Sequence, residues 1–142
     1  MNNNTQSASA SASASASWMQ ILSKKGTPEF AASFTPDVSL QTSALSKEVV
    51  GPTAIATFFT TTSTLYENFV FVKESIVDEK TYLEWDATHA GKPIAGMTVL
   101  TRSDSGLINN IKLFQSPFSV IREFSSALSV QLQDVLGLEF FK

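Results

Sequence analysis

The pattern of apolar and polar residues between Tyr82 and Pro117 predicts three strands joined by two tight turns. In the first of these segments the two kinds of residue alternate strictly, which is typical of a strand with one buried face. Here Leu83, Trp85 and Ala87 alternate with Glu84, Asp86 and Thr88. Gly91-Lys92-Pro93 and Ser103-Asp104-Ser105-Gly106 supply turn-forming residues between the segments. We expect this stretch to form the middle of a curved antiparallel sheet.

Helices and further strands are predicted on the N-terminal side of this stretch. We expect a helix over residues 13–23, a short helix that ends at Phe34, and a strand over residues 37–42. Gly51 and Pro52 open the next helix. Its apolar face carries Ile55, Phe58, Phe59 and Thr62. Residues 69–77 are rich in β-branched and aromatic side chains, which favours another strand.

On the C-terminal side, Ser116 and Pro117 begin a final helix. Its apolar stripe has helical spacing and consists of Ile121, Phe124, Leu128, Leu132 and Val135. Gly137 ends the helix, and the apolar tail that follows contains Leu138, Phe140 and Phe141. In a monomer such a tail must either fold back onto the domain or stay exposed to a partner.

Length, composition and charge narrow the possible functions. The chain has 142 residues, of which 43% are hydrophobic, and this is enough for one domain with a real core. We assign residues 1–12, which are polar and then alternate between Ser and Ala, to a low-complexity leader, and residues 13–142 to a single domain. The net charge of -3 and the scattered basic residues disfavour a nucleic-acid partner.

The sequence also bears on compartment and on metal binding. There is no cysteine, so neither a disulfide nor a Cys-ligated metal is expected. We find no basic and apolar leader typical of secretion and no apolar run long enough to span a bilayer. The expectation is a cytoplasmic protein with no membrane partner.

Three stretches of the sequence are FAASFTPDVSL, VVGPTAIATFF and AGKPIAGMTVLTRSDSGLINNIKLFQSP. With these stretches and the predicted order of helices and strands, the chain resembles the nuclear-transport-factor-2-like superfamily, especially its SnoaL-like and ketosteroid-isomerase-like members. The resemblance covers roughly residues 18–130. Its markers are Asp37-Val38, Gly51, Ile55 and Phe58-Phe59, with Gly91, Gly96 and Gly106 expected in hairpins.

This resemblance implies an α+β fold of the cystatin-like kind. A strongly curved antiparallel sheet would wrap around the N-terminal helices as a cone-shaped barrel, with a C-terminal helix, and would enclose an apolar pocket. The resemblance also implies a homodimer formed through the sheet.

The resemblance further indicates where catalytic side chains would lie, and this sequence has other residues at those positions. The aspartate base of ketosteroid-isomerase-like members corresponds to Thr42, and their second, protonated aspartate corresponds to Thr98. SnoaL-like cyclases carry an acidic residue where this chain has Gln115. The family's tyrosine in the first helix has no counterpart near residues 18–22. Neither a threonine hydroxyl nor a side-chain amide can act as a general base near neutral pH. These three residues are therefore expected to orient a ligand.

Two groups of ionisable residues are weaker candidates for chemistry. His89 is in phase with Trp85, which would aim it at the pocket mouth as a general acid or base. We favour a surface histidine at a hairpin end, because no orienting partner is evident. Glu84 and Asp86 could share a proton or a metal ion. We favour a solvated face or a charged dimer surface and expect no metal site, because no further ligand cluster accompanies them.

We therefore predict a domain that binds a small apolar or amphipathic molecule in an internal pocket, without a cofactor. Thr42, Thr98 and Gln115 would make the polar contacts, and Phe58, Phe59, Trp85 and Met97 would form the apolar lining. One alternative is an isomerase- or cyclase-type enzyme for a polyketide- or steroid-like substrate, which requires a titratable side chain in the pocket. The other is a non-catalytic interaction module with a filled cavity, which would bind through the sheet face or the C-terminal tail.

Overall fold

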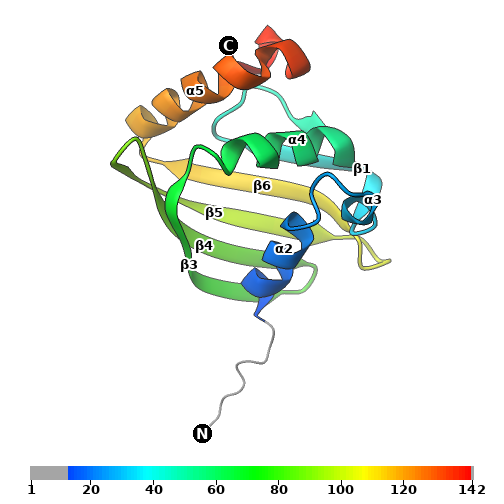
Figure 1. Cartoon of the computed structure of the whole chain (residues 1–142). Coiled ribbons are helices and arrows are strands. Elements are labelled where there is room, and N and C mark those ends of the chain that lie inside the picture. Colours follow the sequence, from blue (N-terminus) through cyan, green and yellow to red (C-terminus); the bar gives the residue numbers. More distant parts are fainter. Residues whose placement is uncertain (1–12, 142) are drawn as a thin grey trace, which may run out of the picture.

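A curved six-stranded sheet is the framework of the molecule, and helices pack against its concave face (Figure 1). The computed structural model describes residues 13–141. The strands are β1 (Phe34–Thr42), β2 (Val49–Val50), β3 (Glu67–Val77), β4 (Lys80–His89), β5 (Lys92–Arg102) and β6 (Ile108–Ser116). The helices are α2 (Ala14–Leu22), α3 (Pro28–Ala31), α4 (Pro52–Thr62) and α5 (Phe118–Leu136), followed by the short 3-10 helix η1 (Leu138–Phe141).

The order of strands across the sheet is β2-β1-β6-β5-β4-β3. Strands β3 to β6 form consecutive antiparallel pairs, as the sequence pattern predicts, whereas β1 lies parallel to β6. The sheet is therefore mixed, and β2 and β3 are its two edges. The α+β class and the curved sheet are confirmed, but the sheet does not close into a barrel.

Pairing across the sheet decides which side chains face the helices. Phe71 of β3 pairs with Trp85 of β4, Trp85 pairs with Gly96 of β5, and Gly96 pairs with Gln115 of β6. Directly paired residues on neighbouring strands project from the same face of a sheet. These four residues therefore form one row on the concave face. Glu84 and Asp86, on the opposite face, are exposed, as the solvated-face interpretation requires.

The core lies between this concave face and the helices. Helix α4 contributes Ile55, Phe58 and Phe59, and α5 contributes Ile121, Phe124, Leu128 and Leu132. Val135 was expected in the same stripe but is 64% exposed, so the buried face of α5 stops one turn earlier than predicted. The apolar tail folds back, since the Phe140 carbonyl oxygen accepts a hydrogen bond from the Ser46 N–H (2.7 Å) and both Phe140 and Phe141 pack against the core.

Local contacts determine where the first two helices begin and end. Helix α2 begins at Ala14 because the Ser13 hydroxyl accepts from the Ala16 N–H (3.0 Å) and the Glu74 carboxylate of β3 accepts from the Ala14 N–H (2.7 Å). The following helix ends at Ala31 instead of Phe34. Phe34 begins β1 because its backbone pairs with β6 and its ring is buried.

Two further points concern the ends of the chain and the membrane. The predicted leader, residues 1–12, lies outside the described residues. Within residues 13–141, no helix combines the length and apolar character needed to cross a bilayer.

Candidate functional site

A cavity of about 320 Å³ lies between α2, the end of α4 and the concave face of the sheet. Six aromatic side chains line it, namely Trp18, Phe59, Tyr66, Phe69, Phe71 and Trp85. Its volume lies at the lower end of the range of small-molecule sites, about 300 to 1,000 Å³. The wall also includes Met19, which is 48% exposed, and the exposed residues Ser23 and Ser63, and these mark the end of the cavity that opens to solvent.

Trp85 forms much of the inner wall because Gly96 leaves room for its ring. A Cβ atom at position 96 would lie 2.4 Å from Cζ2 of Trp85 and 2.6 Å from the carbonyl oxygen of Phe114. The indole therefore lies over the backbone of the neighbouring strand, and its N–H donates to Oγ1 of Thr98 at 3.1 Å. Phe69 stacks on this indole with ring centroids 4.9 Å apart. Gly96 was expected in a hairpin, but it lies in the middle of β5.

A chain of hydrogen bonds leads from β1 through β6 to the Tyr66 hydroxyl in the cavity wall. The Ala44 N–H donates to Oγ1 of Thr42 (3.2 Å), and the Thr42 hydroxyl donates to Oε1 of Gln115 (2.7 Å). The amide nitrogen of Gln115 then donates to the hydroxyl oxygen of Tyr66 (2.6 Å). The hydrogen bonds between these three side chains, from β1, β6 and the loop after α4, thus all run in one direction, and each residue donates to the next.

Tyr66 presents its hydroxyl group to the cavity at the end of this chain of hydrogen bonds. Its ring stacks on Phe124 (4.8 Å between centroids) and meets the edge of Trp85 (5.2 Å). Burial raises the pKa of the Tyr66 hydroxyl well above its ordinary value, and the hydrogen bond from Gln115 offsets only part of that effect. Tyr66 is therefore a neutral hydroxyl at physiological pH.

The structure brings some of the predicted site residues into the cavity wall and leaves others outside it. Phe59, Trp85 and Thr98 line the cavity. Thr42 and Gln115 lie behind the wall, where they position Tyr66.

The two remaining predicted lining residues do not face the cavity. Phe58 is buried in the core and meets the edge of the Phe59 ring, with ring centroids 5.4 Å apart. Met97 pairs with Glu84 and Phe114 on the outer face of the sheet, because it precedes Thr98 in a strand whose side chains alternate between faces. We had expected both residues in the cavity wall, and the structure places neither of them there.

His89 is buried, with 8% of its surface exposed, so the expectation of a surface histidine was wrong. Its Nδ1 lies 2.9 Å from the Leu65 carbonyl oxygen. A carbonyl oxygen only accepts hydrogen bonds, so Nδ1 carries the proton. The ring also meets the edge of Phe124, and it is absent from the described residues that line the cavity. These contacts indicate that His89 has a structural role, in the packing of α5 against the end of β4.

Metal ligands are not clustered in the part of the chain that the structure describes. Residues 13–141 contain no group of three or more His, Cys, Asp or Glu side chains arranged to hold a metal ion.

The two ionisable residues of the wall, Tyr66 and Lys25, were missed from the sequence. Lys25 lies in the turn after α2 and lines the cavity beside Leu22 and Ser23. Both residues lie in connecting segments, where no periodic pattern predicts which way a side chain points. The one usable signal was composition, because Tyr66 is one of only two tyrosines beside eleven phenylalanines.

Comparisons with known proteins identify the architecture. No protein-family model and no curated protein matches this sequence. The chain is similar in structure to a steroid delta-isomerase from Pseudomonas aeruginosa, with 17% identity, a TM-score of 0.74, and coverage of 93% of this chain and 96% of that one. A protein of Silicibacter pomeroyi described as having a cystatin-like fold gives 14% identity, a TM-score of 0.73 and 84% coverage of each chain.

An NTF2-like protein of unknown function from Cytophaga hutchinsonii is also similar. It gives 13% identity and a TM-score of 0.54, over 74% of this chain and 91% of that one. At these identities the likeness concerns the fold alone. The chain has the nuclear-transport-factor-2-like fold, as the sequence resemblance predicts.

Proposed function

We propose that this domain binds a small apolar or amphipathic molecule in the cavity between α2 and the sheet. The observation that carries this proposal is the cavity itself, about 320 Å³ in volume, with an aromatic wall and an open end. Apolar contact with such a wall supplies most of the affinity of a small ligand, and a few placed polar groups fix its orientation.

The inner polar groups support a ligand that carries a hydrogen-bond acceptor. The hydroxyl oxygen of Tyr66 accepts from Gln115, so the Tyr66 proton is left for another acceptor, and none is found among residues 13–141. Thr98 accepts from the Trp85 indole N–H and likewise keeps its own proton. A carbonyl or hydroxyl oxygen at the inner end of the ligand would receive hydrogen bonds from these two groups.

An isomerase- or cyclase-type enzyme is the second candidate function, and the likeness to a steroid delta-isomerase fold is the observation that favours it. Such a reaction needs a group that moves a proton. Among the described residues of the wall, Tyr66 and Lys25 are the ionisable ones. Tyr66, as a neutral hydroxyl, would then stabilise a substrate oxygen by donating a hydrogen bond to it.

The proposal is tested by measuring the binding of two neutral apolar probes, 1-dodecanol and androstenedione, by isothermal titration calorimetry. Ser63→Trp places a large ring at the mouth, at an exposed helix-end residue, and is expected to abolish binding. Thr64→Trp is the matched control, because Thr64 is exposed and adjacent but does not line the cavity. Failure of both probes to bind, or equal binding to both variants, would overturn the proposal.

We also propose that the outer face of the sheet pairs with a second copy of the chain, as the family resemblance implies. Phe114 and Val70 are 55% and 52% exposed on this face, and Met97 lies beside Phe114. Light scattering after size exclusion is expected to give the mass of a dimer for the natural sequence and of a monomer for Phe114→Glu. A monomeric natural protein at micromolar concentration would refute this arrangement.

A further inference from the structure

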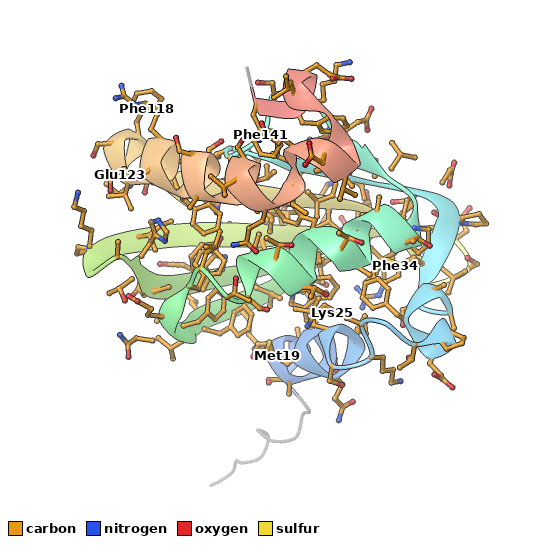
Figure 2. The ribbon with its side chains drawn as sticks, turned by 45° about the horizontal axis from the view of Figure 1, so that its top comes forward. Met19, Lys25, Phe34, Phe118, Glu123 and Phe141 are labelled. Atoms are coloured by element: carbon orange, nitrogen blue, oxygen red, sulfur yellow. The ribbon has the colours of Figure 1, made fainter. Side chains whose placement is uncertain are left out.

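Lys25 places a positive charge at the mouth of the cavity. Among the described residues that line the cavity, it alone carries a formal charge. Its Nζ donates to the Leu22 carbonyl oxygen at 3.0 Å. That carbonyl belongs to the last residue of α2, where the helix dipole favours a cation. Figure 2 labels Met19 on α2 and Lys25 after it, and both residues line the cavity. The half-buried ammonium group is thus held in place beside the opening.

This ammonium group has no carboxylate partner within residues 13–141. The ion pair found there joins Lys92 to Glu123, with 2.8 Å between Nζ and Oε2. An ammonium group carries three donor hydrogens, and Leu22 accepts one of them. The remaining donors of Lys25 are left for solvent or for a ligand.

The other polar groups at the mouth already have acceptors. The Ser23 hydroxyl donates to the Gln20 carbonyl oxygen (2.6 Å), and the Ser63 hydroxyl donates to the Thr60 carbonyl oxygen (2.8 Å). Lys25 is therefore the group at the open end that can bind a polar part of a ligand. At the inner end the available groups, on Tyr66 and Thr98, are also donors.

From the positive charge at the mouth and the aromatic interior we infer that the ligand is an amphipathic anion. Its apolar body fills the aromatic interior, and its carboxylate, or a comparable anionic group, binds Nζ of Lys25 at the mouth. The inference rests on the proposed function and specifies its ligand class. A neutral apolar molecule would leave the half-buried ammonium with the Leu22 carbonyl oxygen and no anionic partner, whereas a carboxylate gives it a charge-assisted hydrogen bond.

The test compares two probes of equal chain length, dodecanoate and 1-dodecanol, by isothermal titration calorimetry at pH 8 and below their aggregation concentrations. Dodecanoate is expected to bind the natural protein about tenfold more tightly than 1-dodecanol, because a hydrogen bond to a charged group is worth about 1.5 kcal/mol or more. Lys25→Met keeps an unbranched apolar side chain of nearly the same length and removes the charge, and should weaken dodecanoate binding about tenfold without affecting 1-dodecanol.

Lys24→Met is the matched control. Lys24 is adjacent and exposed, carries the same charge and does not line the cavity, so this variant should bind dodecanoate as the natural protein does. Equal affinity of the two probes for the natural protein, or equal effects of the two substitutions, would overturn the inference and leave the proposed function standing. If neither probe binds, or if Ser63→Trp binds both probes as the natural protein does, the proposed function falls as well.

Discussion

Replacing Gly96 by alanine should destabilise the domain and disturb the cavity at the same time. The new Cβ would lie 2.4 Å from Cζ2 of Trp85 and 2.6 Å from the Phe114 carbonyl oxygen. Real Cβ atoms do not approach other atoms so closely, and one of these neighbours is backbone of the adjacent strand. The indole must therefore tilt towards the cavity, and strands β5 and β6 must separate locally.

The magnitude follows from two contributions. Overpacking of a core site costs about 1 to 3 kcal/mol. Tilting the indole also breaks its hydrogen bond to Thr98, now 3.1 Å long, which adds about 1 kcal/mol. We expect a loss of about 3 kcal/mol in the free energy of unfolding, which for a domain of this size lowers Tm by about 10 °C.

Guanidinium unfolding followed by far-UV circular dichroism measures this loss. The same substitution in a Trp85→Phe background provides the control, because the smaller ring leaves room for part of the added methyl group. The cost of Gly96→Ala should fall by about 1 kcal/mol in that background. A Gly96→Ala protein within about 0.5 kcal/mol of the natural one, or an undiminished cost in the Trp85→Phe background, would refute the account of the inner wall.

Two further predictions concern the hydrogen bonds that hold the start of α2 and the Trp85 indole in place. Partial burial raises the pKa of Glu74, but its hydrogen bonds from the Ala14 N–H and from Ser15 outweigh this and lower it below the ordinary value of 4.5. A carboxyl group whose pKa is lower in the folded than in the unfolded state stabilises the fold at a pH above its unfolded-state pKa. This stabilisation should be lost as the pH falls below about 4.5. Over that pH range, Tm should therefore fall less for Glu74→Gln than for the natural protein. Thr98→Val keeps the side-chain shape but leaves the Trp85 indole N–H unpaired, so urea unfolding should show a loss of about 1 to 3 kcal/mol; an unchanged midpoint would contradict the role of that hydrogen bond.

The sequence predicted the individual helices and strands well because burial of one face imposes a period on them. The alternation of Leu83, Trp85 and Ala87 and the helical spacing in α4 both correspond to buried faces. The parallel pairing of β1 with β6 was not predicted, since these strands are far apart in sequence and local periodicity carries no information about such a contact. Phe34 was assigned to a helix for the same reason, because its strand partner is Ile108.

The candidate site was predicted less completely than the fold. Trp85 and Phe59 lie on the apolar faces of periodic segments, and Thr98 was indicated by the family resemblance; all three line the cavity. Tyr66 and Lys25 lie in connecting segments, where tertiary contacts alone determine the direction of a side chain. His89 was misjudged because nothing in the β4 pattern shows that α5 packs over the end of that strand.

The measurement that tests the central claim most directly is a crystal structure of the protein with 12-bromododecanoate, in which anomalous scattering locates the bromine. The account predicts bromine at the inner end of the cavity, beside Tyr66 and Trp85, and a carboxylate within hydrogen-bond distance of Nζ of Lys25. Bromine density on the outer surface, with the cavity closed by its own aromatic side chains, would contradict it.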